Sequence, residues 1–221
     1  MVIGFRGPTK LYIDAASAVV RHAEADGIQR TGYSMSRLMV SFSLVALMMF
    51  MPVVSTQAQT MQNENLQVAN PKGYTVANQT NNDRIIMSEM VPAGETVQNW
   101  TEMVTIQLFL KLSNVTPPQF RERLEKLWAD SCPGSTFTNV KEGVENGYPT
   151  LTWLQKCPQN KETGKPEVTM LKGVQGRDSF YLVQKAFRFE PSADQSTLWT
   201  KYLDNVQVCD TRLKDRPCRA P

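Results

Sequence analysis

The chain has 221 residues, of which 41% are hydrophobic and 20% charged, so its composition is that of a folded protein and excludes a disordered or collagen-like chain. The 24 Lys and Arg residues outnumber the 21 Asp and Glu residues, which leaves a formal net charge of +3. Because the charges form no long run of one sign, the sequence lacks the basic patch that nucleic acid or anionic lipid requires, and we expect no nucleic-acid partner.

The strongest signal in the sequence is an export signal over residues 35–58. Arg37 supplies the basic start, and the apolar stretch over 38–51 is shorter than the roughly 20 residues that a membrane-spanning helix needs. Small residues precede a cleavage point after Ala58, as signal peptidase requires. We expect a periplasmic or secreted protein that contacts the membrane only transiently, through this segment. The alternative is an uncleaved N-terminal anchor.

The regions around this signal divide the chain. Residues 1–34 precede it, although an export signal normally lies at the N-terminus of a protein. We therefore expect translation to begin at Met35 and residues 1–34 to be a mis-annotated upstream extension. Residues 59–72 are rich in Gln and Asn and predict a flexible leader, and residues 73–221 predict a single domain. The one histidine, His22, precedes that domain, so His-based catalysis and His-ligated metal are not expected in it.

The first half of the domain predicts three strands, at residues 74–77, 84–91 and 103–110. In the third, Val104, Ile106 and Leu108 alternate with other side chains, the period of two that is typical of a strand with a buried face.

A helix is predicted to follow these strands. Thr116 and Gln119 have the spacing of a capping box, and Pro117 fits the first helical position. The helix has an apolar face with the spacing i, i+4, i+7 and i+8, formed by Phe120, Leu124, Leu127 and Trp128. Pro133 and Gly134 predict its end near Cys132.

Two hairpins and a last helix complete the domain. The first hairpin joins residues 136–142 to 150–156 around Asn146-Gly147, and the second joins 168–174 to 180–189 through Gly176-Arg177-Asp178. The helix is predicted over 192–205, with a second capping box and an apolar stripe of Leu198, Trp199, Tyr202, Leu203 and Val206. This order predicts an α+β fold, in which a mainly antiparallel sheet is flanked by two main helices in an α/β/α sandwich.

Four cysteines, Cys132, Cys157, Cys209 and Cys218, follow the export signal, and none has the C-x-x-C spacing of a redox or zinc motif. Disulfides are therefore the expected state. Of the three possible connectivities we favour Cys132 with Cys157, because the end of the first helix and the end of a hairpin strand can lie side by side. This leaves Cys209 with Cys218. A four-cysteine metal site is the alternative, and we expect neither a metal nor another cofactor.

Two residues are candidates for a ligand or partner surface. The segment 173–179 has the glycines of a phosphate-binding loop, but it joins two strands, so we expect a hairpin turn that exposes Arg177. Trp100 lies in a loop-like segment, whereas Trp128 and Trp199 fall on helix stripes that face a core. No catalytic residue is predicted, since the carboxylates that are close in sequence are expected to be solvated.

Two stretches, Val91–Phe109 and Gly176–Pro191, resemble uncharacterised exported proteins of alphaproteobacteria such as rhizobia. The resemblance extends from about Gly73 to Cys218, and its motifs are structural, so it implies no catalytic residue. The order of elements is also similar to that of the PsbP/Mog1-like α/β/α sandwich. That second resemblance implies a fold used mainly for binding and accessory roles, and a fold does not determine a function.

The sequence therefore favours an exported, periplasmic, non-enzymatic binding or accessory protein of the cell envelope, whose partner is an envelope protein or a small ligand. One alternative is a His-free hydrolase that uses Ser and Lys or paired carboxylates, which would require a polar cleft and a strongly perturbed Lys or Glu. Another is a structural envelope component, which would self-associate.

Overall fold

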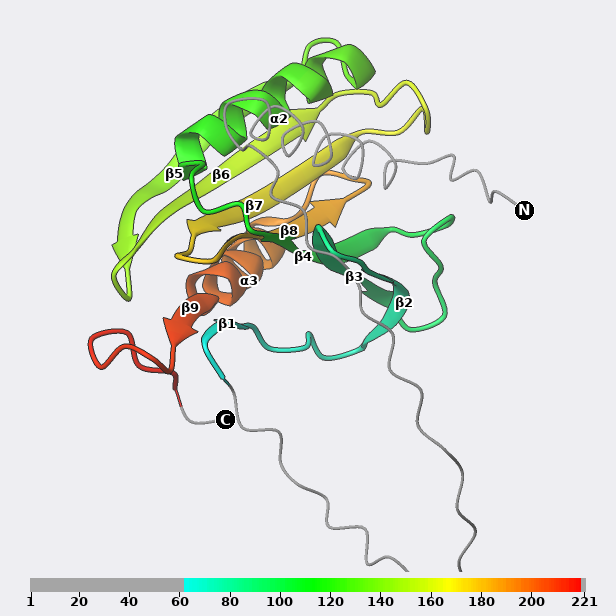
Figure 1. The fold of residues 1–221 in the computed structure, drawn as a ribbon. Helices are drawn as coiled ribbons and strands as arrows, with labels where there is room; N and C mark the ends of the chain where they lie inside the picture. The colour runs from blue at the N-terminus through cyan, green and yellow to red at the C-terminus, as the bar shows by residue number, and fades with distance from the viewer. Residues whose placement is uncertain (1–61, 220–221) are drawn as a thin grey trace, which may run out of the picture.

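The computed structural model describes residues 62–219, which form one large sheet with a helix on each face and a small second sheet (Figure 1). The predicted export signal, the extension over 1–34 and His22 lie outside the described residues. Within residues 62–219, no helix combines the length and the apolar character needed to cross a membrane.

The elements follow the predicted order, with one additional short strand at each end. They are β1 (Glu64–Gln67), β2 (Tyr74–Asn81), β3 (Ile85–Pro92), β4 (Glu102–Leu110), α2 (Pro117–Ser131), β5 (Thr136–Glu145), β6 (Tyr148–Cys157), β7 (Glu167–Gln175), β8 (Ser179–Phe187), α3 (Ala193–Asp204) and β9 (Gln207–Asp210). Seven strands form the large sheet in the order β2-β3-β4-β8-β7-β6-β5, and β1 pairs with β9 in the small one. Every pairing between described strands is antiparallel, so the α+β prediction is confirmed.

Helix α2 covers one face of the large sheet and contacts β6 and β7 (Figure 1). Its capping box is present, since Thr116 accepts from the Gln119 backbone and Gln119 accepts from the Thr116 backbone. The predicted apolar face is buried at Phe120, Leu124 and Trp128, and the Phe120 ring stacks on Phe180 of β8 with 4.3 Å between centroids. Tertiary packing therefore holds the helix where its apolar stripe meets the sheet.

Helix α3 covers the opposite face (Figure 1). Ser192 and Gln195 form the second predicted capping box. Trp199 and Leu203, one turn apart, are buried, but Leu198 is 62% exposed, so its place in the predicted stripe was wrong. Neighbouring helix residues point about 100° apart, and with Trp199 directed at the sheet, the side chain of Leu198 turns to solvent.

Two disulfides fasten the ends of elements, and their connectivity is the one favoured from the sequence. Cys132, just after α2, is bonded to Cys157 at the end of β6. Cys209 of β9 is bonded to Cys218 in the C-terminal loop. No cysteine among residues 62–219 is free.

The segment predicted as a flexible leader contains the strand β1, and this is the main difference from the sequence analysis. β1 pairs with β9 in the register Glu64 to Asp210 and Gln67 to Gln207. Four residues with little apolar character give no detectable strand pattern, because this strand is held by long-range contacts rather than by a buried face.

The two outermost strands of the large sheet are irregular. The register of β2 against β3 shifts between Val76 and Asn78, and that of β5 against β6 shifts between Asn139 and Lys141. Such shifts are bulges, which bend a strand and interrupt its ladder of hydrogen bonds.

We predict that Leu124→Ala lowers the free energy of unfolding by about 2 to 5 kcal/mol, because Leu124 is buried between α2 and the sheet and its truncation leaves a cavity. The matched variant on the same helix is Glu122→Ala, which removes an exposed carboxylate that pairs with Lys126 and should leave the free energy of unfolding nearly unchanged. Urea titration of both variants measures the difference. Equally mild effects would show that α2 contributes little to the core.

Candidate functional site

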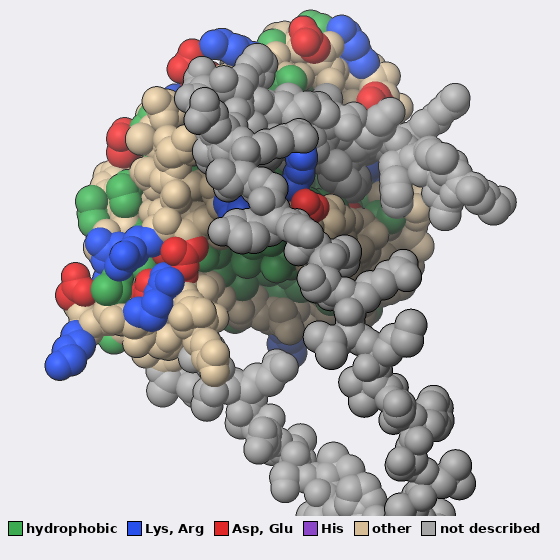
Figure 2. All heavy atoms as spheres, viewed as in Figure 1, with side chains coloured by type: hydrophobic (Ala, Val, Ile, Leu, Met, Phe, Trp, Pro, Cys, Tyr) green, Lys and Arg blue, Asp and Glu red, His purple; other side chains and the backbone are tan. Residues whose placement is uncertain are grey.

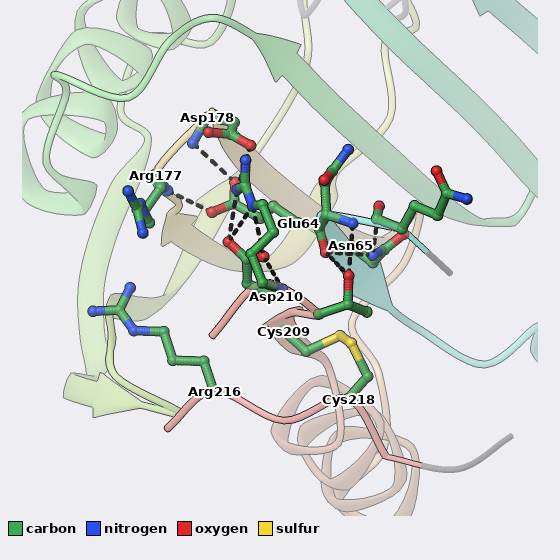
Figure 3. A network of polar contacts seen from close by, with 12 residues as sticks. Glu64, Asn65, Arg177, Asp178, Cys209, Asp210, Arg216 and Cys218 are labelled. Carbon is green, nitrogen blue, oxygen red and sulfur yellow. Dashed lines mark hydrogen bonds and ion pairs between the residues drawn. A yellow bond between two sulfur atoms is a disulfide. The ribbon is translucent and has the colours of Figure 1, made fainter. Parts of the chain in front are cut away.

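The turn between β7 and β8 binds a carboxylate through its backbone. The turn is closed by a hydrogen bond from the Gly176 N–H to the Ser179 carbonyl at 2.9 Å. The backbone N–H of Arg177 donates to Oε2 of Glu64 at 2.5 Å, and that of Asp178 donates to Oε1 at 3.1 Å. The Tyr181 hydroxyl donates to the same Oε1 at 2.9 Å (Figure 3). We call these three donors, together with Gly176, the carboxylate cradle.

Gly176 is required for this geometry. A Cβ added at this position would overlap Oε1 of Glu64, and it would also lie 2.7 Å from the Ser179 carbonyl oxygen. The glycine thus lets the carboxylate approach the backbone, as glycines do in loops that bind anions. The turn is a hairpin turn, as predicted, but it binds an anionic group without a helix N-terminus. Burial, together with the charge of Glu64, raises the pKa of Tyr181, which therefore stays a donor.

The strand β9 and the loop that follows it lie next to the carboxylate cradle (Figure 3). Arg212 donates to both carboxylate oxygens of Asp210 and, at 2.6 Å, to Oδ2 of Asp178 in the β7–β8 turn. The hydrogen bonds from Arg212 lower the pKa of Asp210, which keeps this carboxylate charged. The disulfide Cys209–Cys218 closes the loop, so β9, its loop and the turn form one connected unit.

The turn between β5 and β6 supports β9 from another side. Asn146 adopts φ 48°, and its side-chain amide donates to the Val208 carbonyl at 2.8 Å. The guanidinium of Arg216 lies 4.4 Å from the centroid of the Tyr148 ring. Figure 2 shows Lys and Arg side chains gathered beside Asp and Glu side chains at this end of the molecule, where the loop after β9 lies.

Lys172 of β7 is bonded to the end of α3, directly before β9 in the chain. Its ammonium group donates to the carbonyls of Leu203 at 3.0 Å and Val206 at 2.9 Å, at the end of α3, and to Oε2 of Glu145 at 2.5 Å. The side chain is only 1% exposed, so these three partners satisfy all the donors of a buried cation. The cation also complements the negative end of the helix dipole.

A second buried lysine, Lys185 of β8, lies on the same face of the sheet, under α3. Its Nζ donates to Oε2 of Glu102 and to the Tyr74 hydroxyl, each at 2.5 Å, and lies 3.9 Å from the Trp199 ring centroid. Burial lowers the pKa of Lys185 to about 8. Within the described residues, the hydrogen-bond partners of its Nζ are Glu102 and Tyr74 rather than a Ser or Thr hydroxyl.

The face that carries α2 also holds buried polar groups on the central strands. Gln184 of β8 donates to Oε1 of Gln107 on β4 at 2.8 Å. Glu167, at the start of β7, is 1% exposed, and burial raises its pKa to about 7. Asn160 and Thr169 are its polar neighbours, at 3.4 and 3.5 Å. Such a carboxyl resembles a general acid in its pKa, but it is enclosed, and its hydrogen bonds are to Asn160 and Thr169 rather than to a second carboxylate.

The two residues predicted for a binding surface lie in different places. Arg177 is exposed in the β7–β8 turn, and its backbone belongs to the carboxylate cradle. Trp100 is 2% exposed and packs with Val91 and Met103, and the guanidinium of Arg188 lies 4.0 Å from its ring centroid. The structure does not bring the two together, and both stay predictions as contact residues. Within residues 62–219 no group of three or more His, Cys, Asp or Glu side chains could hold a metal ion.

Comparisons with known proteins find similarity at the level of structure. No family model matches the chain, and no curated protein matches its sequence. A structure of a Mog1 mutant has a TM-score of 0.39 and 11% identity over 62% of this chain and 78% of its own. Cyanobacterial PsbP from Synechocystis has a TM-score of 0.36 and 12% identity over 69% and 94%. LpqN of Mycobacterium tuberculosis, described as involved in cell envelope biogenesis, has a TM-score of 0.34 and 10% identity over 69% and 87%. Mog1 and PsbP are the two proteins named by the fold resemblance.

Sequence reasoning missed Glu64, Gly176 and Tyr181 as parts of one site. Gly176 and Arg177 were noticed as a turn, but Glu64 lies 113 residues away from Arg177 and in a segment predicted to be flexible. The only available signal was the glycine before the polar pair Arg177-Asp178, which indicates a turn with free backbone donors.

We predict that Glu167 contributes stability that is lost as pH rises from about 4.5 to about 7, because the folded carboxyl keeps its proton in this range while the unfolded chain loses it. One such group gives a slope of at most about 1.4 kcal/mol per pH unit. Glu167→Gln should remove this part of the slope, and the exposed control Glu122→Gln should keep it. Urea titrations at several pH values measure the slope, and an unchanged slope in Glu167→Gln would contradict the assignment.

Proposed function

We propose that this chain is an exported, non-enzymatic binding or accessory protein of the cell envelope, which binds a partner at the carboxylate cradle and β9. The observation that carries the proposal is the cradle itself, where two backbone N–H groups and one hydroxyl are directed at a single carboxylate. Convergent donors that are fixed by their own scaffold are typical of recognition sites.

The two disulfides support the proposed location outside the cytoplasm. Disulfides persist in oxidising compartments and are rare in the cytosol. Cys132–Cys157 and Cys209–Cys218 account for all the cysteines of the chain. Together with the export signal predicted over residues 35–58, they favour the periplasm or secretion.

The hydrolase alternative requires a Lys or Glu with a strongly shifted pKa, and Lys185 and Glu167 have such pKa values. Their surroundings, however, do not suit catalysis. Lys185 is bonded to Glu102 and Tyr74 and lies against the ring of Trp199, with no exposed side-chain surface. Glu167 is equally buried. A substrate would have to displace the contacts of α3 to reach Lys185, and for this reason we favour structural roles for both groups.

We predict that the chain expressed from Met35 in a Gram-negative host is recovered from the periplasm with Gln59 as its first residue and without thiols that react before reduction. The physical reasons are the signal length, the cleavage site after Ala58 and the paired cysteines. N-terminal sequencing and thiol labelling of the osmotic-shock fraction measure this. Cytoplasmic protein with four reactive thiols would contradict the proposed location.

Binding at the carboxylate cradle is tested by photo-crosslinking in the envelope of the source organism. A photoreactive residue that replaces Arg177 should form a specific adduct with an envelope component. The matched control replaces Lys165, an exposed residue that precedes the other end of β7 and is therefore roughly 30 Å away. Equal adducts from both positions, or none from position 177, would contradict a binding role for this end of the molecule.

A further inference from the structure

The strand β1 occupies a binding site that is formed by the rest of the chain. Glu64 places its carboxylate in the carboxylate cradle, and the strand pairs with β9 through Gln67. Leu66 packs beside Val208 and Tyr148. The Gln67 side chain exchanges two hydrogen bonds of 2.9 Å with the backbone of Arg219. The contacts are those of a peptide added to a strand edge, with an acidic residue two positions before an apolar one.

The site that β1 occupies consists of β9, the loop after β9 and the β7–β8 turn. These parts are held together by bonds that do not involve β1. The loop after β9 is closed by Cys209–Cys218 and tied to the β7–β8 turn through Arg212. Asn146 bonds to β9, and Lys172 bonds to the end of α3 just before it. The site therefore remains formed when β1 leaves it, and a preformed site costs little conformational entropy on binding.

β1, by contrast, is a short segment, and its contacts with β9, with the loop after β9 and with the β7–β8 turn are non-covalent. It has four residues, and six residues separate it from β2. Of that connection, Ala69 accepts a hydrogen bond from the Tyr202 hydroxyl at 2.8 Å. A strand of this length is marginal by itself, so its stability depends on the carboxylate and on β9.

The charges around the site define what can replace β1. The side chains of Arg177 and Arg216 stand beside the cradle (Figure 3), whereas Asp178 and Asp210 are both paired with Arg212. Arg216 also pairs with Asp215 at 4.0 Å, so the cation that an incoming acidic segment meets is the exposed Arg177. Complementary charge of this kind favours an acidic partner over a basic one.

We infer that β1 is a displaceable occupant, and that the carboxylate cradle and the β9 edge bind an extended acidic segment of a partner protein, with a carboxylate side chain two residues before an apolar one. This inference rests on the proposed function and names the partner chemistry of the same site. β1 then competes with the partner for the site. Because β1 belongs to the same chain, its effective concentration is high, and the partner segment must bind tightly enough to displace it.

A labelled peptide with the sequence of residues 62–70 is the probe. Glu64→Gln in the full chain puts an amide NH₂ against backbone N–H donors, which weakens β1 and frees the site. The peptide should bind this variant at least tenfold more tightly than the wild-type chain, measured by fluorescence anisotropy. The matched chain variant Glu142→Gln changes an exposed carboxylate of β5 and should bind like the wild type.

A peptide that carries Gln in place of its glutamate should bind the Glu64→Gln chain at least tenfold more weakly. Equal binding of the two peptides, or equal binding to both chains with retained circular dichroism, would overturn the inference. A wild-type dimer that is lost in Glu64→Gln would assign the site to β1 of a second copy and would also overturn it. If only these peptide results fail while crosslinking from position 177 persists, the proposed function stands without this inference.

Discussion

The central strands β4, β8 and β7 are buried on both faces, and this constraint determines the arrangement of the rest of the chain. On β4, Val104 belongs to the cluster under α3, and Phe109 belongs to the cluster under α2. Both faces therefore need a cover, and two amphipathic helices supply it. Lys172 and Lys185 on these strands are shielded from water, which is why each ends in a set of short hydrogen bonds.

Most of the fold could be predicted because local signals agreed with the final packing. The two capping boxes, the Asn146-Gly147 turn and the alternation over 103–110 each depend on residues close in sequence, and each element is present. The disulfide between Cys132 and Cys157 followed from the ends of predicted elements. The prediction that Leu198 is buried was wrong because the predicted apolar stripe of α3 is wider than the face that packs on the sheet. That face is occupied by Trp199 and Leu203.

The candidate site was far less predictable, because its parts come together only through long-range contacts. Glu64 and Tyr181 are 117 residues apart, and the pairing of β1 with β9 joins the two ends of the described chain. Neither strand has an apolar alternation, and four-residue strands carry too little pattern to be detected. Arg177 was selected for its exposed side chain, whereas its contribution to the site is a backbone N–H, a group that every residue except proline has.

The bulges in β2 and β5 have a consequence for the behaviour of the molecule at high concentration. A flat, regular edge strand offers a ladder of free backbone groups to any other chain, which is how sheets grow into fibrils. Here both outer strands of the seven-stranded sheet are bent at Val76/Asn78 and at Asn139/Lys141. Lys141 and Glu145 add charge to the β5 edge and form an ion pair there. The large sheet is thus a poor template for a further strand, so that strand pairing between protein molecules is discouraged at both of its margins.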